Sequence, residues 1–130
     1  MLSHVFVGVS DFERSLRFYS AVMGCMGHTL RFSEPERPWA GWHSEGGRRP
    51  FFVIALPHDR EAHHSGNGQM TAFMAPSRAV VDAAHAEALA HGGRCEGPPG
   101  LRLQYHANYY GAYFRDPDGN KLAVACHEAE

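Results

Sequence analysis

Hydrophobic and polar residues follow the same plan in two stretches of the chain. Residues 4–9 have the short apolar pattern of a strand, and the next residues place apolar side chains at helical spacing. The apolar stripe of this helix consists of Phe12, Leu16, Tyr19 and Met23. Ser10 and Glu13 match a capping box, and Gly24 fits a left-handed C-terminal cap. The pattern therefore predicts a strand followed directly by a helix.

The same plan returns about 66 to 68 residues later. Residues 70–75 predict a strand, Pro76 and Ser77 start a helix, and Gly92 with Gly93 ends it. The apolar stripe of this second helix consists of Val81, Ala84 and Ala88. Further strands are expected at 28–33, 38–43 and 51–56 after the first helix, and at 94–103, 109–115 and 121–126 after the second. Each half is thus predicted to be a βαβββ unit.

Residues 116–120, Asp-Pro-Asp-Gly-Asn, are the strongest turn signal in the chain. Proline presets one turn dihedral, Asp118 can bond its own backbone, and Gly119 supplies the positive φ that other residues resist. Together with the opening run from His4 to Tyr19, this motif resembles the vicinal-oxygen-chelate superfamily. That superfamily contains glyoxalase I, extradiol dioxygenases and bleomycin or fosfomycin resistance proteins. The resemblance covers nearly the whole chain.

The resemblance implies an α+β fold in which two βαβββ modules form a cupped mixed sheet that lines a pocket. We expect one glyoxalase-like domain over residues 1–130, with module one at about 1–57, a polar, glycine-rich linker at about 58–68 and module two at about 69–130. A βαβββ unit alone leaves one face of its sheet bare. The units must therefore pair within the chain, across a dimer, or both, and we expect a homodimer.

The family's typical metal site uses four inward-facing side chains, from the first and last strands of each half. The matching positions here are His4, Ala55, Met70 and Ala123, with one residue of slip from Met70 to Gln69 allowed. Alanine has no donor atom, and a methionine thioether is a soft ligand unsuited to hard or borderline divalent ions. His4 is the only family-type ligand that remains, and a catalytic metal normally needs three protein ligands. We therefore expect no metal and no other cofactor.

Aromatic side chains with polar tips suit a pocket for a small organic ligand. Three tyrosines gather near the start of the penultimate strand, and we expect Tyr105, Tyr109 and Tyr113 to contact a ligand. Core or dimer packing is an equally open interpretation for Tyr109 and Tyr113. Trp42 is a further ligand-binding candidate, although Trp39 and Trp42 could also pack between subunits.

Two functions from different classes remain open. The first is a small-molecule-binding protein with a degenerate metal site, of the bleomycin-resistance kind, which sequesters its ligand without breaking a bond. The alternative is an enzyme, a glyoxalase-type lyase or a dioxygenase-like protein. It would use a relocated divalent metal (Zn, Ni, Fe or Mn) or employ His4 or His106 as a metal-independent general base, since imidazole titrates near neutrality. The missing metal ligands favour the first function.

Composition excludes several kinds of partner. Twelve Lys plus Arg residues against 14 Asp plus Glu give a formal charge of -2, which offers no electrostatic footprint for nucleic acid. The cysteines, Cys25, Cys95 and Cys126, are odd in number and form no Cys-x-x-Cys pair, which favours a reducing cytoplasm. No basic leader or bilayer-length apolar stretch is evident. We expect a cytoplasmic protein that contacts no membrane.

Overall fold

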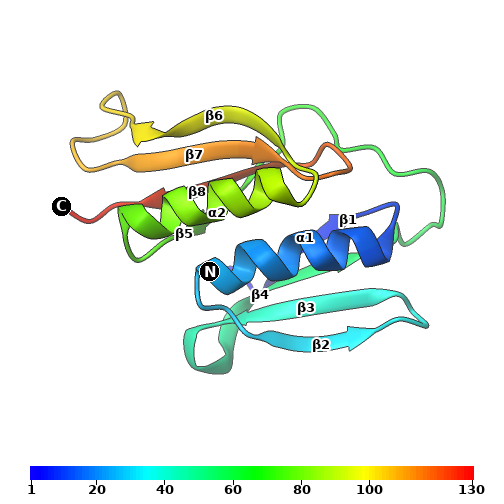
Figure 1. Ribbon diagram of the computed structural model, residues 1–130. Coiled ribbons are helices and arrows are strands. Elements are labelled where there is room, and N and C mark those ends of the chain that lie inside the picture. The colour runs from blue at the N-terminus through cyan, green and yellow to red at the C-terminus, as the bar shows by residue number, and fades with distance from the viewer.

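Two βαβββ modules follow one another in the computed structural model, which describes residues 1–130 (Figure 1). Module one consists of β1 (His4–Gly8), α1 (Phe12–Cys25), β2 (Leu30–Glu34), β3 (Trp39–Ser44), the 3-10 turn η1 (Glu45–Gly47) and β4 (Arg48–Ala55). Module two consists of β5 (Thr71–Met74), α2 (Arg78–Ala90), β6 (Arg94–Leu101), β7 (Tyr110–Arg115) and β8 (Lys121–Cys126). The two predicted units are thereby confirmed. Neither helix is long and apolar enough to cross a membrane.

Each module folds into its own four-stranded mixed sheet. We call them sheet A, with strand order β1-β4-β3-β2, and sheet B, with order β5-β8-β7-β6. The first and last strands of each module pair in parallel, and the other neighbours pair antiparallel. Val5 lies opposite Phe52 in sheet A, and Thr71 lies opposite Leu122 in sheet B. The same framework is therefore built twice.

The helices lie between the two sheets, and α1 contacts both of them (Figure 1). Phe18 packs against Phe114 of sheet B, with 6.3 Å between the ring centroids. The ring centroid of Tyr19 lies 6.3 Å from that of Trp42 and 5.1 Å from that of Phe52, both in sheet A. One continuous core of buried apolar side chains spans both modules. The opposite face of each sheet consequently points away from the helices, and we call it the outward face.

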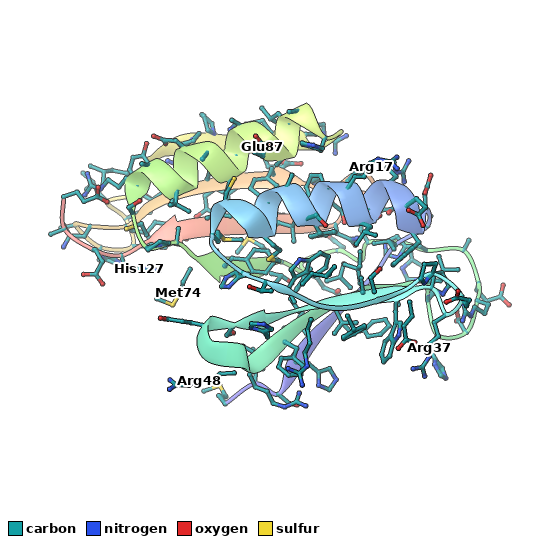
Figure 2. The ribbon with its side chains drawn as sticks, turned by 60° about the horizontal axis from the view of Figure 1, so that its bottom comes forward. Arg17, Arg37, Arg48, Met74, Glu87 and His127 are labelled. Atoms are coloured by element: carbon teal, nitrogen blue, oxygen red, sulfur yellow. The ribbon has the colours of Figure 1, made fainter.

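The outward faces carry exposed apolar side chains. Because successive side chains alternate between the two faces of a strand, His4 and Phe6 point outward while Val5 packs toward the core. Phe6 is 49% exposed, and Met74, on the outward face of sheet B, is 73% exposed. Met74 and His127 lie at the same end of the molecule (Figure 2). Within one chain the two sheets remain separate, so their outward faces do not cover each other.

The N-terminal cap of α1 differs from the predicted capping box. The cap is Asp11, whose carboxylate accepts a hydrogen bond from the backbone N–H of Arg14 at 3.1 Å. Ser10 does not cap the helix, because Asp118 of the β7–β8 turn accepts hydrogen bonds from its backbone N–H and its hydroxyl. The hydroxyl of Ser10, which the local pattern predicted as the helix cap, thus donates to a residue far along the chain, Asp118.

The C-terminal end of α1 also differs from the prediction. The helix continues through Gly24 to Cys25, and Gly27 is the residue with the left-handed conformation, at φ +77°. Both ends of α2 are as predicted. Ser77 caps its start by accepting a hydrogen bond from the backbone of Val80, and Gly92 follows its end at φ +92°.

The turn between β7 and β8 joins the two modules. Gly119 has the predicted positive φ, at +87°, but Asp116 closes the turn in place of Asp118. One oxygen of Asp116 accepts from the backbone N–H groups of Asp118 and Asn120, both at 2.9 Å. Its other oxygen accepts from the hydroxyl of Tyr19 in α1 at 2.6 Å. Burial raises the pKa of Tyr19 well above its usual value, and the nearby Asp116 charge raises it further.

We expect Tyr19→Phe to lower the free energy of unfolding by about 1–3 kcal/mol, because the buried carboxylate of Asp116 would lose a donor. Urea denaturation measures the change. Tyr105→Phe is the matched control, since that ring is exposed, and it should change the free energy of unfolding by less than about 0.5 kcal/mol. Equal unfolding midpoints for both variants would contradict a structural role for the Tyr19 hydroxyl.

Candidate functional site

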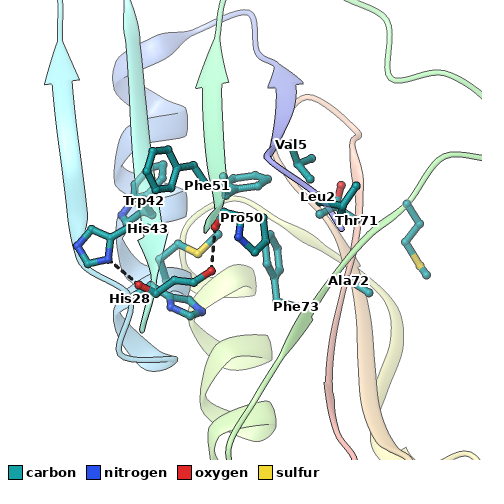
Figure 3. Close-up of a pocket in the computed structure, with 14 residues that line it drawn as sticks. Leu2, Val5, His28, Trp42, His43, Pro50, Phe51, Thr71, Ala72 and Phe73 are labelled. Carbon is teal, nitrogen blue, oxygen red and sulfur yellow. Dashed lines mark hydrogen bonds between the residues drawn. The ribbon is translucent and has the colours of Figure 1, made fainter. Parts of the chain in front are cut away.

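A pocket of about 350 Å³ opens where the two modules meet, and we call it the junction pocket (Figure 3). Its size lies in the range of roughly 300–1,000 Å³ that is typical of small-molecule sites. Aromatic side chains from both modules form much of its wall. Phe52 of β4 and Phe73 of β5 meet edge to face, with 5.0 Å between their centroids. The pocket therefore depends on both modules being in place.

Strand alternation explains why these side chains converge. Val5, Trp42 and Phe52 come from three different strands of sheet A, and all three point to its helix side. Met23, in the last turn of α1, lines the same pocket. Trp42 is only 3% exposed, so its ring is held by the surrounding core and is positioned before any ligand arrives.

Two histidines supply the polar groups of the junction pocket. Burial lowers the pKa of His28, and the neighbouring His43 lowers it further, so His28 is neutral at neutral pH. The Nδ1 atom of His43 donates to the carbonyl of Ser44 at 2.7 Å. The lining contains no aspartate, glutamate, lysine or arginine. The pocket is thus suited to an uncharged, mostly apolar group that forms one or two hydrogen bonds with imidazole.

The strand register allows the positions that match the family's metal ligands to be compared between the two modules. In module two, Ala72, two residues after Met70, lies opposite Ala123. In module one, Phe6, two residues after His4, lies opposite Val53, and Ala55 is two residues further along β4. By strand register, the counterpart of Ala123 is therefore Val53, and the counterpart of Ala55 is Ala125. Ala55 and Ala123 are thus not equivalent between the two modules, and their assignment as metal positions stays a prediction. A shift of two residues keeps the same face of a strand, so Val53 and Ala55 lie on one face of β4.

The residues at these positions do not fit a divalent metal. Among His4, Ala55, Met70 and Ala123, only the imidazole is a suitable donor for a hard or borderline ion. His4 is exposed, and its Nδ1 atom lies 3.1 Å from the hydroxyl of Ser3. No group of three or more His, Cys, Asp or Glu residues in the chain is arranged to hold a metal ion. If Val53 is taken in place of Ala55, the conclusion is the same, since valine also lacks a donor.

The predicted ligand-binding residues fall into two separate groups. Tyr105, Tyr109 and Tyr113 lie together, with 4.9 Å between the ring centroids of the first two and 3.1 Å between the hydroxyls of the last two. Burial raises the pKa of Tyr113, and its hydrogen bond with Tyr109 raises it further. Trp42 lies apart from them, on the helix side of sheet A, and it is the only one of the four that lines the junction pocket.

The two histidines predicted as alternative general bases are not brought together. His106 lies on the tyrosine side, where its Nε2 atom is 2.8 Å from Nδ1 of His127. The backbone N–H of Asn108 donates to Nδ1 of His106, so His106 carries its proton on Nε2 and donates it to His127. The side chain of His4 has a hydrogen bond only with the hydroxyl of Ser3. Neither histidine lines the junction pocket.

Sequence reasoning missed several residues of the junction pocket. Phe52, Phe73 and Met23 were predicted only as parts of strands or of a helix stripe, and His28 was not singled out. Alternation within β4 does place Phe52 on the core face, which is a usable signal. No local pattern indicates that β5 of the second module closes this pocket.

Comparison with known proteins places the whole fold. Residues 1–124 match the profile of the Glyoxalase/Bleomycin resistance protein/Dioxygenase superfamily. No curated protein matches the chain. A crystal structure of a glyoxalase/bleomycin resistance protein from Albidiferax ferrireducens is 38% identical, with a TM-score of 0.86, and the similarity covers 97% of this chain and 98% of that one.

More distant structures share the fold. A glyoxalase/bleomycin resistance protein/dioxygenase family enzyme from Burkholderia phytofirmans is 20% identical, with a TM-score of 0.72 over 97% of this chain and 98% of that one. A putative glyoxalase from Bacillus halodurans is 22% identical, with a TM-score of 0.71 over 97% and 95%. The profile match and the first of these structures confirm the resemblance seen in the sequence. The chain belongs to the glyoxalase/bleomycin resistance protein/dioxygenase superfamily.

Proposed function

We propose that this protein binds a small, mainly aromatic organic molecule in the junction pocket, without a metal ion and without breaking a bond in it. The observation that carries the proposal is a preformed pocket with aromatic walls and no charged side chain. Such a wall binds a planar apolar group by desolvation and ring packing. Sequestration of a harmful compound, as in a resistance protein, is a role that needs only binding.

The metal positions support a binding protein over a metal-dependent enzyme. A second copy of the chain would not supply the missing ligands, because Met70 and Ala123 lack suitable donors in every copy. A histidine acting as a general base would have to reach a bound substrate, and neither His4 nor His106 lines the junction pocket. His28 and His43 do line it, but they have no acidic partner there to orient them for proton transfer.

We also propose that the protein forms a homodimer in which outward faces of two copies meet. Phe6 on sheet A and Met74 on sheet B are large apolar residues left exposed by the single chain. Burial of such faces against a second copy removes apolar surface from water. A cytoplasmic location belongs to the same proposal, on the odd number of cysteines.

A neutral nitroaromatic compound tests ligand binding directly. In a Trp39→Phe background, Trp42 is the only tryptophan, and we expect 4-(4-nitrophenyl)butanamide to quench its fluorescence in a saturable manner. Thr71→Phe, which fills the pocket, should weaken this binding by at least about tenfold. Ser20→Phe, on the exposed side of α1, is the control and should bind normally. Quenching that is linear and equal in all variants would refute the binding site.

Metal content tests the second part of the proposal. We expect protein purified without an affinity tag to contain substoichiometric Zn, Ni, Fe and Mn, because His4 has no ligand partners at the family positions. His4→Ala should leave the metal content and the melting temperature unchanged. Elemental analysis and thermal shifts with and without EDTA measure both. One bound metal per chain that disappears in His4→Ala would overturn the proposal.

Light scattering coupled to gel filtration tests the dimer. We expect a mass about twice the 14.4 kDa of one chain. Phe6→Glu and Met74→Glu should shift the protein toward the monomer, since each places a charge on an outward face. Leu89→Glu changes an exposed leucine on α2 in the same way and should leave the dimer intact. A wild-type mass of one chain at micromolar concentrations would contradict the proposal.

A further inference from the structure

A second pocket adjoins the junction pocket and has a different chemical character. It has a volume of about 470 Å³ and lies between β1, the linker and the start of β8. Val5, Met70 and Thr71 line both pockets, so the two hollows are neighbours along the same seam between the modules. We call the second hollow the polar pocket.

The lining of the polar pocket includes hydrogen-bond donors and one permanent cation, Lys121, but no aspartate or glutamate. The polar side chains that line it are those of His58, His63, His64, Ser65, Gln69, Thr71, Asn120 and Lys121. Donors and a cation with no acidic residue in the lining favour a negatively charged group. The junction pocket, by contrast, has no charged side chain at all.

Lys121 is the permanent positive charge that distinguishes the polar pocket from the junction pocket. It is the only lysine in the chain, and its side chain forms no ion pair and no hydrogen bond with another residue. Its ammonium lies 5.9 Å from the ring centroid of Tyr113. The Lys121 charge helps to lower the pKa of Glu96 on β6, after the larger effect of Arg115, but the Glu96 carboxylate is already paired with Arg115 at 2.6 Å and with Arg94 at 3.8 Å. Lys121 is therefore available to pair with a ligand.

The fixed residues of the polar pocket are held in place by the turn that joins the modules. Asn120 donates to the carbonyl of Gly8 at 2.9 Å and to Asp116 at 2.8 Å. Its amide oxygen accepts from Nε2 of His63 at 3.1 Å, which ties the linker to the turn. His64 and Gln69 form no hydrogen bond within the chain, so their polar atoms are free for a ligand.

We infer that the ligand is an aromatic carboxylic acid, with its ring in the junction pocket and its carboxylate beside Lys121 in the polar pocket. This inference rests on the proposed function and adds the chemical class of the ligand. One permanent cation matches one negative charge, which favours a carboxylate over a doubly charged phosphate. Two adjoining pockets of opposite character match a molecule with an apolar body and a single ionised end.

Two matched probes test the inference. In the Trp39→Phe background we compare 4-(4-nitrophenyl)butanoic acid, ionised at neutral pH, with its amide, using quenching of Trp42. We expect the acid to bind about tenfold more tightly than the amide, the effect of one charge-assisted hydrogen bond. Lys121→Met should remove most of this preference and leave the affinity for the amide unchanged. Arg17→Met, which removes a positive charge from the exposed side of α1 (Figure 2), should preserve it.

A labelling experiment gives a second readout in the unaltered protein. Acetylation by an amine-reactive ester, followed by mass spectrometry, reports on Lys121 and the N-terminal amine alone, since the chain has no other lysine. The acid should protect Lys121 and leave the N-terminal amine reactive, whereas the amide should protect neither.

The outcomes separate the inference from the function on which it rests. If neither probe gives saturable quenching of Trp42, the proposed function fails and the inference fails with it. If the amide binds but the acid binds no more tightly, only the carboxylate assignment is wrong. If the preference for the acid survives in Lys121→Met and Lys121 is not protected from acetylation, the placement of the carboxylate is overturned.

Discussion

The arrangement of the two modules depends on the hydrogen bonds that the buried carboxylate of Asp116 accepts. One of its oxygens closes the turn between β7 and β8, and the other accepts from Tyr19 of the first helix. Burying an ionised carboxylate is costly unless donors surround it, so the turn and the helix must be in register for either to be stable. Asn120, bonded to the same carboxylate, reaches the carbonyl of Gly8 at the end of β1. The last turn of module two is thus attached to the first strand and helix of module one.

Both pockets follow from this attachment. Because α1 is held between the sheets, the apolar sides of the two modules share one core, and the aromatic residues of sheet A meet Phe73 of β5. The hydrogen bond between His63 and Asn120 brings the linker against the same turn, and the polar pocket forms there. The junction pocket is apolar because it is a gap in the shared core. The polar pocket is polar because exposed linker residues such as His58, His64 and Gln69 bound it.

Membership of the superfamily accounts for the fold and leaves the chemistry open, since one fold supports unrelated activities. What differs among members is the set of side chains at a few positions of each strand. Here His4 is the only suitable donor at the positions that match the family's metal site, since Ala55, Met70 and Ala123 cannot bind a hard ion. The aromatic and basic residues at the seam between the modules are the groups that can give this member its specificity.

The sequence by itself determined the elements and their repetition. The apolar stripes of both helices, the start of α2 at Ser77 and the glycine of the final turn are local features, and each was predicted correctly. Only the tertiary structure decided that the hydroxyl of Ser10 would donate to Asp118, that Val53 would be equivalent to Ala123 by strand register, and that Phe73 would contact Phe52. These outcomes depend on contacts between residues far apart in the chain. Alternation along a strand fixes which face a side chain occupies, but it does not fix the strand's register or the partner that the face will meet.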